Sequence, residues 1–453
     1  MQQPATSSNQ PGSGEASSLW REAWYAVAYV RDLDPRRPNA FTLLGQDLVL
    51  WFDRQTERWR AFADVCPHRL VPLSQGRLNA RGELECPYHG WCFDGDGRCT
   101  QIPQAPEGSS ISERSHSRIY ATATGQGLLF VYAGDPARAD DSPLPLLPML
   151  QQQGDGWADG WVVQDTFRDL PMDALTLLEN VLDASHVPFT HHATVGRRDN
   201  AGPVELELSG FGAGGFQGLW QEGPRKGTLG TQHTTFLAPS LMWHDLTARG
   251  FARILTVVYA TPMRRGECRL IARFPFRFAS PWPARLLLLR PQWLQHIGNH
   301  TVLEDDQLFL HWQERVLEQR GGSAEAIRSF HLPTRADRYV QALHDWVNRH
   351  AGEPFPGQPL PPRLGPTALM ERYEAHTRHC RSCSGALAAL GKLQRFCAIA
   401  LLVALGAATL LPFAAAKLAV LLMAALAAAL WAQGRRWTRQ LQQGSGQPPR
   451  NRL

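Results

Sequence analysis

The sequence has few cysteines for its length and no marked excess of charge of either sign. Its 453 residues include eight cysteines, 46 Lys and Arg, and 41 Asp and Glu, for a net charge of +5. So few thiols in so long a chain exclude a disulfide-stabilised secreted scaffold. The small and diffuse positive charge gives no basis for nucleic-acid binding. We therefore expect no nucleic-acid partner.

The chain also shows no signal peptide, no dinucleotide fingerprint between a strand and a helix, and no flavin motif. Without a cofactor that accepts a hydride, any redox chemistry must take its electrons from a separate protein. Residues 1–18 are rich in Ser, Gly, Gln and Pro and contain no apolar run, so they predict a disordered leader.

The remaining chain changes character along its length. Short strands and turns predict an all-β domain over 19–136, and a Pro- and Gln-rich linker over 137–156 follows. Mixed strand and helix patterns predict an α+β domain over 157–370, then a connector over 371–394. An apolar segment at 395–434 and a basic tail at 435–453 complete the chain.

Two apolar runs, 396–416 and 418–432, lie near the end of the chain. One helix across both would be about 55 Å long, which exceeds a bilayer core of about 30 Å. A break at Pro412 and Lys417 therefore predicts a hairpin of two transmembrane helices. A single anchor and a hairpin in a soluble core are the alternatives. Basic residues on both outer flanks place both flanks, and the catalytic domain, on the cytoplasmic side.

Four of the cysteines lie within 34 residues, and two of these belong to the motifs Cys66-x-His68 and Cys86-x-x-His89. Two interpretations compete for these pairs. A structural zinc would take all four side chains on one ion. A Rieske cluster would place the two Cys on one iron and the two His on the other. Zinc sites of this type normally place the second pair on a helix, whereas Pro67, Pro87 and Asp/Gly turns surround these pairs, which favours the cluster.

A second pattern, Asn-x-x-Asp-x-x-His-x4-His, places Asn180, Asp183, His186 and His191 in one stretch. On an ideal helix His186 and His191 would lie about 140° apart and would not share a face. They converge only if the helix ends between them, and Pro188 supplies that end. Taken alone, the two histidines would more often be ordinary ones than metal ligands.

The two patterns together resemble the Rieske non-haem iron oxygenases. The resemblance implies an N-terminal Rieske domain with a [2Fe-2S] cluster and a helix-grip-like catalytic domain with a mononuclear Fe(II). Two His and a later carboxylate then form a facial triad, with His186 and His191 as two of its members. Among "LEDDQLFLHWQ", Asp306 is preferred over Asp305 because Gln313 follows it by seven residues.

The same resemblance implies roles for the other residues. Asp183, with Asn180 beside it in the pattern, links the two metal centres between subunits of a homotrimer. Substrate oxygenation would use O2 and electrons from a ferredoxin-like donor.

The C-terminal third, with His376-x3-Cys380-x-x-Cys383 before the apolar runs, is similar to the membrane-bound pheophorbide a oxygenase branch of plants and cyanobacteria. That branch implies a hydrophobic, tetrapyrrole-like substrate such as pheophorbide a, and a thylakoid or plasma membrane of a cyanobacterium-like cell. Other lipophilic or aromatic substrates, or a membrane-tethered redox sensor or electron carrier with a vestigial iron site, are the alternatives. Cys380 and Cys383 admit three interpretations: a redox thiol pair, a metal site with His376, or two idle thiols.

Overall fold

The computed structural model describes residues 18–154, 156–247, 251–412 and 414–445. It divides into two compact units. The first combines 1–185, 200–279 and 310–363, and the second combines 186–199, 280–309 and 364–453. Residues 1–17 of the predicted leader lie outside the described part of the chain. The units cut across the predicted segment 157–370, so the predicted domain limits remain a proposal about sequence organisation.

The N-terminal part of the first unit is all-β, as predicted. Within the described residues its strands form three antiparallel sheets, β1-β11-β10, β2-β3-β4-β9 and β5-β6-β7-β8. Strands β3 and β4 form a hairpin, with Val49, Trp51 and Phe62 in the core. The strands are β1 Trp24–Tyr29, β2 Asn39–Leu43, β3 Gln46–Asp53, β4 Arg58–Ala63, β5 Arg77–Leu78, β6 Leu84–Glu85, β7 Cys92–Phe93, β8 Cys99–Gln101, β9 Ile119–Tyr120, β10 Thr122–Gly125 and β11 Leu128–Tyr132.

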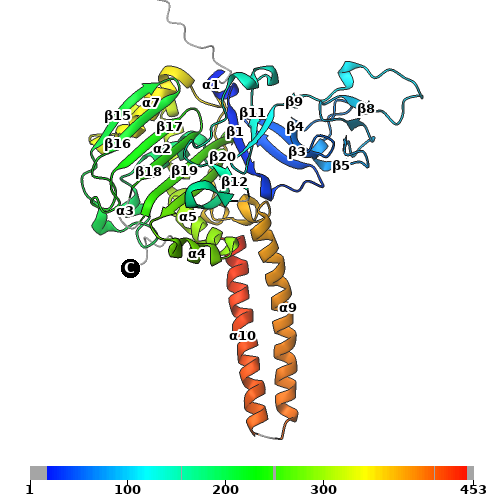
Figure 1. Cartoon of the computed structure of the whole chain (residues 1–453), viewed down its shortest axis with the longest axis vertical. Helices are drawn as coiled ribbons and strands as arrows, with labels where there is room; N and C mark the ends of the chain where they lie inside the picture. Colours follow the sequence, from blue (N-terminus) through cyan, green and yellow to red (C-terminus); the bar gives the residue numbers. More distant parts are fainter. Residues whose placement is uncertain (1–17, 155, 248–250, 413, 446–453) are drawn as a thin grey trace, which may run out of the picture. The chain divides into compact units, whose positions relative to one another are not determined.

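A seven-stranded antiparallel sheet forms the rest of the first unit (Figure 1), in the order β14-β20-β19-β18-β17-β16-β15. Helices α2 and α7 pack against this sheet, which gives the predicted α+β arrangement. The letters G-x-G-x-x-G occur at 210–215, but they join two strands and therefore form no dinucleotide site. The elements are β12 Gln152–Gln153, β13 Gly156–Trp157, β14 Trp161–Leu170, β15 Leu206–Gly212, β16 Gly215–Trp220, β17 Gln232–Leu237, β18 Leu241–Leu246, β19 Phe251–Arg264, β20 Glu267–Phe278, α1 Ser18–Arg21, α2 Ala174–Leu182, α6 Ala326–Ser329 and α7 Arg338–Trp346.

Buried charges join the N-terminal strands to this sheet. Asp165 of β14 accepts from Arg273 Nε of β20 at 2.9 Å and from Arg31 at 3.0 Å, and Arg273 also donates to the carbonyl of Gln126 at 2.8 Å. Burial alone would raise the pKa of Asp165, but Arg273 and Arg31 lower it below its ordinary value. The carboxylate therefore stays ionised and holds two guanidinium groups where the two sheets meet.

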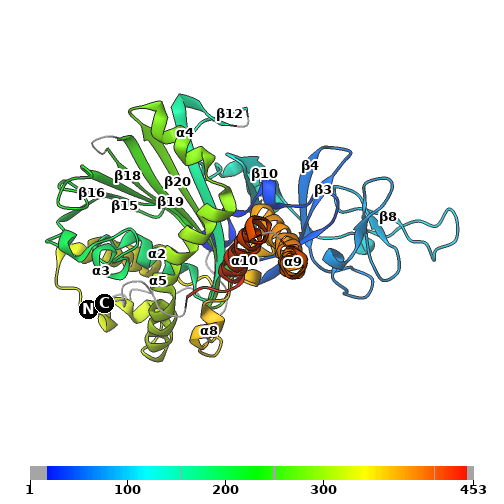
Figure 2. The ribbon, with the colours of Figure 1, turned by 90° about the horizontal axis from the view of Figure 1, so that it is seen from below.

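The second unit is helical and is built around α5 and a long hairpin. Helix α5 begins in this unit and ends in the first. Figures 1 and 2 show α9 and α10 side by side, running antiparallel. The helices are α3 Val187–Thr190, α4 Pro281–Leu289, α5 Gln292–Gln319, α8 Pro366–Leu369, the π-helix η10 Tyr373–Thr377, α9 Arg381–Leu410 and α10 Ala414–Gln442.

The hairpin confirms the predicted pair of apolar helices, with different limits from those predicted. The helices begin before 395 and continue beyond 434, so α9 includes part of the predicted connector and α10 includes part of the predicted tail. The predicted break at Lys417 is wrong, because α10 begins at Ala414 and runs through it; the helices separate at Pro412. Lysine is a good helix former and its long stem lies easily along an apolar surface.

Small residues lie where the two helices meet, since Ala424, Ala427 and Gly434 are buried. The outer surface is apolar and exposed, with Leu402 71% and Leu410 84% exposed. By length and composition both helices are long and apolar enough to cross a bilayer. At the base, Gln394 donates to Thr438 Oγ1 at 2.7 Å, and Trp293 of α5 packs edge-on against Trp437.

We predict that Asp165→Asn destabilises the first unit by about 3–5 kcal/mol, because it leaves Arg273 buried with no full counter-charge. The midpoint of thermal unfolding, followed by near-ultraviolet circular dichroism, should fall by on the order of 10 °C. Glu325→Gln removes the exposed partner of Arg328 and should change stability by less than about 1 kcal/mol. Equal effects of the two substitutions would contradict the structural role of Asp165.

Candidate metal centres

Two similar loops present the Cys/His pairs of the N-terminal domain. In the first, the Cys66 amide donates to Val71 O at 2.9 Å and Leu70 N donates back to Cys66 O at 2.9 Å. In the second, Cys86 N donates to Trp91 O at 2.8 Å and Gly90 N donates to Cys86 O at 3.2 Å. Both loops turn through a positive φ four residues after the cysteine, 60° at Leu70 and 70° at Gly90. A strained leucine at this position is typical of a loop whose shape serves a site.

The thiols of these loops point inward and the imidazoles lie nearer the surface. Cys66 and Cys86 are buried in the domain core, whereas His68 and His89 are only half-buried. The His68 ring stacks on Trp91 at 4.6 Å between centroids, and its Nδ1 is a buried atom without a hydrogen-bond partner in the described residues. Burial, together with the Cys86 sulfur, raises the pKa of the Cys66 thiol to about 11. A buried thiol pair and a free imidazole nitrogen fit a [2Fe-2S] cluster with its histidine iron outermost.

The second predicted site comes together in the second unit. His186 lies just before α3, His191 just after it, and Asp306 lies on α5. The two Nε2 atoms of the histidines are 3.3 Å apart, and His191 Nε2 is 3.2 Å from Asp306 Oδ2. The short helix with Pro188 in its first turn makes the histidines converge, as the sequence suggested. Two imidazoles and one carboxylate within 4.8 Å of one another fit a single non-haem iron.

The acidic neighbours of Asp306 have other partners. Asp305 is fully buried; its Oδ2 lies 3.4 Å from His191 Nδ1 and accepts from Thr194 Oγ1 at 2.9 Å. A carboxylate on the far nitrogen fixes the tautomer and ring orientation of a metal-binding histidine. Glu304 forms a buried bidentate pair with Arg372, at 2.6 and 2.7 Å. Asp306 thus lies on the Nε2 side of His191, where the two histidines meet, and Asp305 lies on its Nδ1 side.

The other two predicted residues lie in the first unit. Asn180 is on α2, and Asp183 follows the end of that helix. One carboxylate oxygen of Asp183 accepts from both the amide and the hydroxyl of Ser185, each at 2.7 Å. This turn fixes the chain immediately before His186. Within this unit Glu179 accepts from Gln313 at 2.9 Å and pairs with His344 at 2.7 Å, so Gln313 contacts a half-buried carboxylate and not the iron group.

A third group of metal-type side chains was only partly foreseen. His376, Cys380 and Cys383 lie together with His296 of α5, and all four are buried. His376 and the two cysteines form one local motif in the sequence. His296 is 80 residues away from His376 in the chain and carries no local signal.

Two family models match separate parts of the chain. The Rieske [2Fe-2S] domain model matches residues 23–121, and the pheophorbide a oxygenase model matches residues 236–324. Together with the fold, these matches define the protein as a Rieske non-haem iron oxygenase that carries a [2Fe-2S] cluster and a mononuclear iron.

Relatives extend this result over most of the chain. Pheophorbide a oxygenase of Arabidopsis thaliana is 36% identical, covering 83% of this chain and 74% of the relative. Flavonoid 8-hydroxylase 2 of Ocimum basilicum is 32% identical, covering 85% and 76%. The structure of Pseudomonas putida NdmA with caffeine superposes with a TM-score of 0.58 at 20% identity, covering 72% of this chain and 89% of that one. The chain belongs to the family of Rieske oxygenases that contains the pheophorbide a oxygenases.

The two adjacent aspartates allow a matched test of the iron group. Asp306→Asn should lose the mononuclear iron and reduce turnover at least about 100-fold, because it removes a charged ligand. Asp305→Asn should keep this iron and lower turnover about 10- to 100-fold, because it loosens only the orientation of His191. The two variants are compared by their content of iron and acid-labile sulfide per chain. The electron-spin signal of the cluster is the control. Loss of iron in Asp305→Asn but not in Asp306→Asn would show that Asp305 is the iron ligand.

Proposed function

We propose that the enzyme oxygenates a chlorophyll-derived tetrapyrrole such as pheophorbide a, with O2 and electrons from a ferredoxin-like donor. The observation that carries this proposal is the 36% identity to a pheophorbide a oxygenase over 83% of the chain, a span too long to be confined to either metal-binding domain. Relatedness of this extent supports a shared substrate class as well as a shared reaction type.

In this proposal Cys66, His68, Cys86 and His89 hold the cluster, and His186, His191 and Asp306 hold the mononuclear iron. When bound, these groups supply one-electron transfer and activation of O2. The chain itself fixes the geometry of the site. Asp305 and Thr194 would orient the His191 ring, and Asp306 would complete the set of three side chains that hold the iron.

We further assign Asp183 and Asn180 to coupling between the two centres. Asp183 ends α2 with one oxygen committed to Ser185. A carboxylate has the chemistry to accept a hydrogen bond from an imidazole. In a homotrimer whose subunits pack head to tail, this carboxylate would orient a cluster histidine of one subunit toward the iron group of the next. The resemblance to the family supports this arrangement.

The hairpin supports a membrane location. We propose that α9 and α10 cross the bilayer with their base, and therefore the catalytic domain, on the cytoplasmic side of a thylakoid or plasma membrane. Lys392 and Arg395 on α9 and Arg435, Arg436 and Arg439 on α10 lie toward the base, which agrees with the positive-inside rule. A membrane anchor places the enzyme where an apolar tetrapyrrole is concentrated.

The flavonoid 8-hydroxylase relative gives the principal alternative, a smaller aromatic substrate. A membrane-tethered sensor or electron carrier is the other alternative, and the convergence of His186, His191 and Asp306 argues against a vestigial iron site. The three candidate functions differ in what stimulates O2 consumption.

The substrate test uses full-length protein in detergent with ferredoxin and its reductase. We expect pheophorbide a to increase ferredoxin-dependent O2 uptake and to yield a product with incorporated oxygen, detected by mass spectrometry with 18O2. Asp306→Asn is the inactive control. Stimulation by a flavonoid but by no chlorin would establish the alternative substrate class. Failure of every compound, with two irons per chain rather than three, would identify an electron carrier.

The membrane proposal predicts where introduced thiols react. Ala414 is exposed at the tip of the hairpin and Arg436 is exposed at its base. The test uses the variants Ala414→Cys and Arg436→Cys. A membrane-impermeant maleimide added to intact bacterial cells should label the tip and leave the base unlabelled, with the unsubstituted chain as background. Labelling of Arg436→Cys from outside would reverse the orientation. Release of the protein by alkaline carbonate without detergent would contradict membrane insertion.

A further inference from the structure

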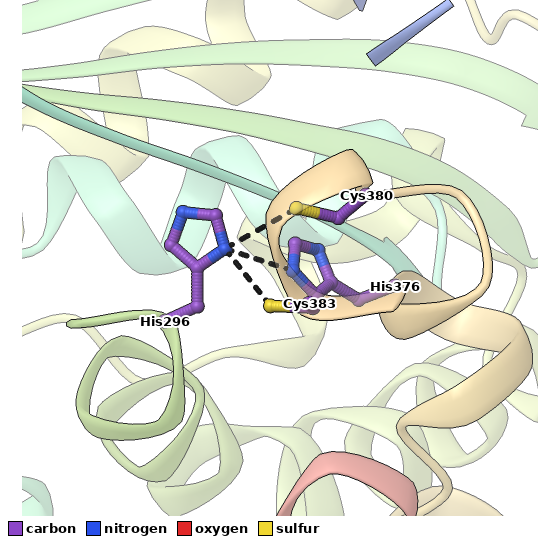
Figure 3. Close-up of side chains that lie close together, drawn as sticks. All are labelled: His296, His376, Cys380 and Cys383. Carbon is purple, nitrogen blue, oxygen red and sulfur yellow. Dashed lines mark hydrogen bonds between the residues drawn. The ribbon is translucent and has the colours of Figure 1, made fainter. Parts of the chain in front are cut away.

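A second set of metal-type side chains lies in the second unit, apart from the iron group (Figure 3). His296 projects from α5, His376 from the π-helix η10, and Cys380 and Cys383 from the start of α9. Each of the four is at most 1% exposed. Their ligand atoms all lie within 4.8 Å of one another. Two imidazoles and two thiols that form no disulfide thus meet in a space closed to solvent.

Hydrogen bonding alone does not account for this arrangement. His296 Nδ1 lies 3.0 Å from His376 Nε2, 3.3 Å from Cys383 Sγ and 3.5 Å from Cys380 Sγ. An imidazole nitrogen carries either one hydrogen or one lone pair, so it can form one full hydrogen bond. The other two of these neighbours would then be in close contact without a hydrogen bond of their own to this nitrogen. A cation among the four atoms would instead be bound by all of them.

The distances between these side-chain atoms are close to those between the ligand atoms of a tetrahedral zinc site. With Zn–N of about 2.0–2.1 Å and Zn–S of about 2.3 Å, the edges of a tetrahedral Cys2His2 site are about 3.3–3.8 Å. The three contacts from His296 Nδ1, 3.0 to 3.5 Å, lie at or just below this range. We propose that His296, His376, Cys380 and Cys383 bind one structural zinc ion, in addition to the irons of the oxygenase.

The donor set and its enclosure identify the kind of site. Tetrahedral S2N2 coordination is typical of zinc, and four protein ligands with no open position are typical of structural rather than catalytic zinc. The surroundings hold the ligands in place. The His300 ring packs on His376 with centroids 4.3 Å apart, and Thr377, next to His376, donates through Oγ1 to the carbonyl of Leu441 at 2.5 Å.

The ion would join three elements that bear on function. It would link the start of the hairpin to α5 at His296, a position ten residues before Asp306. At about 1.5 Å per residue, His296 lies about 15 Å along the helix from the iron group. The buried Glu304–Arg372 pair ties the same elements, and Arg372 also donates to Gln440 O of α10 at 2.7 Å. Zinc would therefore set the position of the iron-binding helix relative to the hairpin base.

A redox switch is the competing interpretation of Cys380-x-x-Cys383. Redox-active cysteines are accessible to their partners, whereas these two sulfurs belong to residues at 0% and 1% exposure and face two imidazoles. Enclosure beside two imidazoles suits these sulfurs to a buried metal ion rather than to exchange with a protein partner.

The test measures metals in full-length protein purified in detergent without a polyhistidine tag. We expect one zinc ion per chain, and zinc-edge X-ray absorption should give two sulfur and two nitrogen neighbours. Iron and sulfide are measured in the same sample, so absence of zinc with a normal iron content overturns this proposal alone. Iron at the third site, or a Cys380–Cys383 disulfide in the protein as purified, would also overturn it.

Variants separate ligation from simple packing. His296→Ala and Cys383→Ser should lower zinc at least about tenfold. His296→Cys keeps a zinc-binding donor and should retain the ion, because Cys3His sites also bind zinc. Cys397→Ser, a buried cysteine further along α9, is the matched control and should keep full zinc. The cluster electron-spin signal reports folding in every variant. Loss of zinc in Cys397→Ser, or its retention in both His296→Ala and Cys383→Ser, would refute the assignment.

Discussion

The rotational register of α5 is the constraint on which the second unit depends. Between His296 and Asp306 this helix buries five polar side chains, His300 among them, and each faces a group on another segment of the unit. His296 meets the cysteines, Glu304 pairs with Arg372, Asp305 contacts His191 and Thr194, and Asp306 approaches the histidines. A buried ionised group without a partner costs several kcal/mol. A shift of one residue rotates the helix by about 100° and would unpair all of these groups together.

The two oxygenase centres are stabilised in different ways. The cluster residues lie in two loops closed by their own backbone hydrogen bonds, so their geometry is local and depends on the turns at Leu70 and Gly90. The iron group draws on segments more than a hundred residues apart, and side-chain pairs orient its ligands. Where the N-terminal strands meet the large sheet, Arg31, Asp165 and Arg273 perform a similar function at a structural junction. At this junction the buried carboxylate of Asp165 is kept ionised by the guanidinium groups that it also positions.

A site could be predicted from the sequence when its ligands lie close together along the chain, and could not when they lie far apart. The Cys/His loops and the His186–His191 turn could be predicted because each motif contains its own turn residues. Asp305 and Asp306 are chemically identical neighbours; the spacing to Gln313 favoured Asp306, and the direction of each side chain in the structure separates them. His296 could not be paired with His376 across 80 residues, because one histidine on a long helix resembles any other. The break at Lys417 was wrong because a charged residue in an apolar run does not by itself end a helix.

The hairpin and the iron group are parts of one compact unit, and this connection limits how the proposed enzyme can meet its substrate. Carbonyl groups near the end of α10 accept hydrogen bonds from Arg372 and Thr377, so the hairpin base is integral to the fold of this unit. An anchor joined by a flexible linker would allow the iron-binding helix any orientation to the bilayer. Here the anchor and that helix share buried pairs, and the proposed zinc would add a further link. If the hairpin is inserted, the direction from which a lipid-dissolved substrate approaches is fixed by the same contacts that hold Asp306 in register.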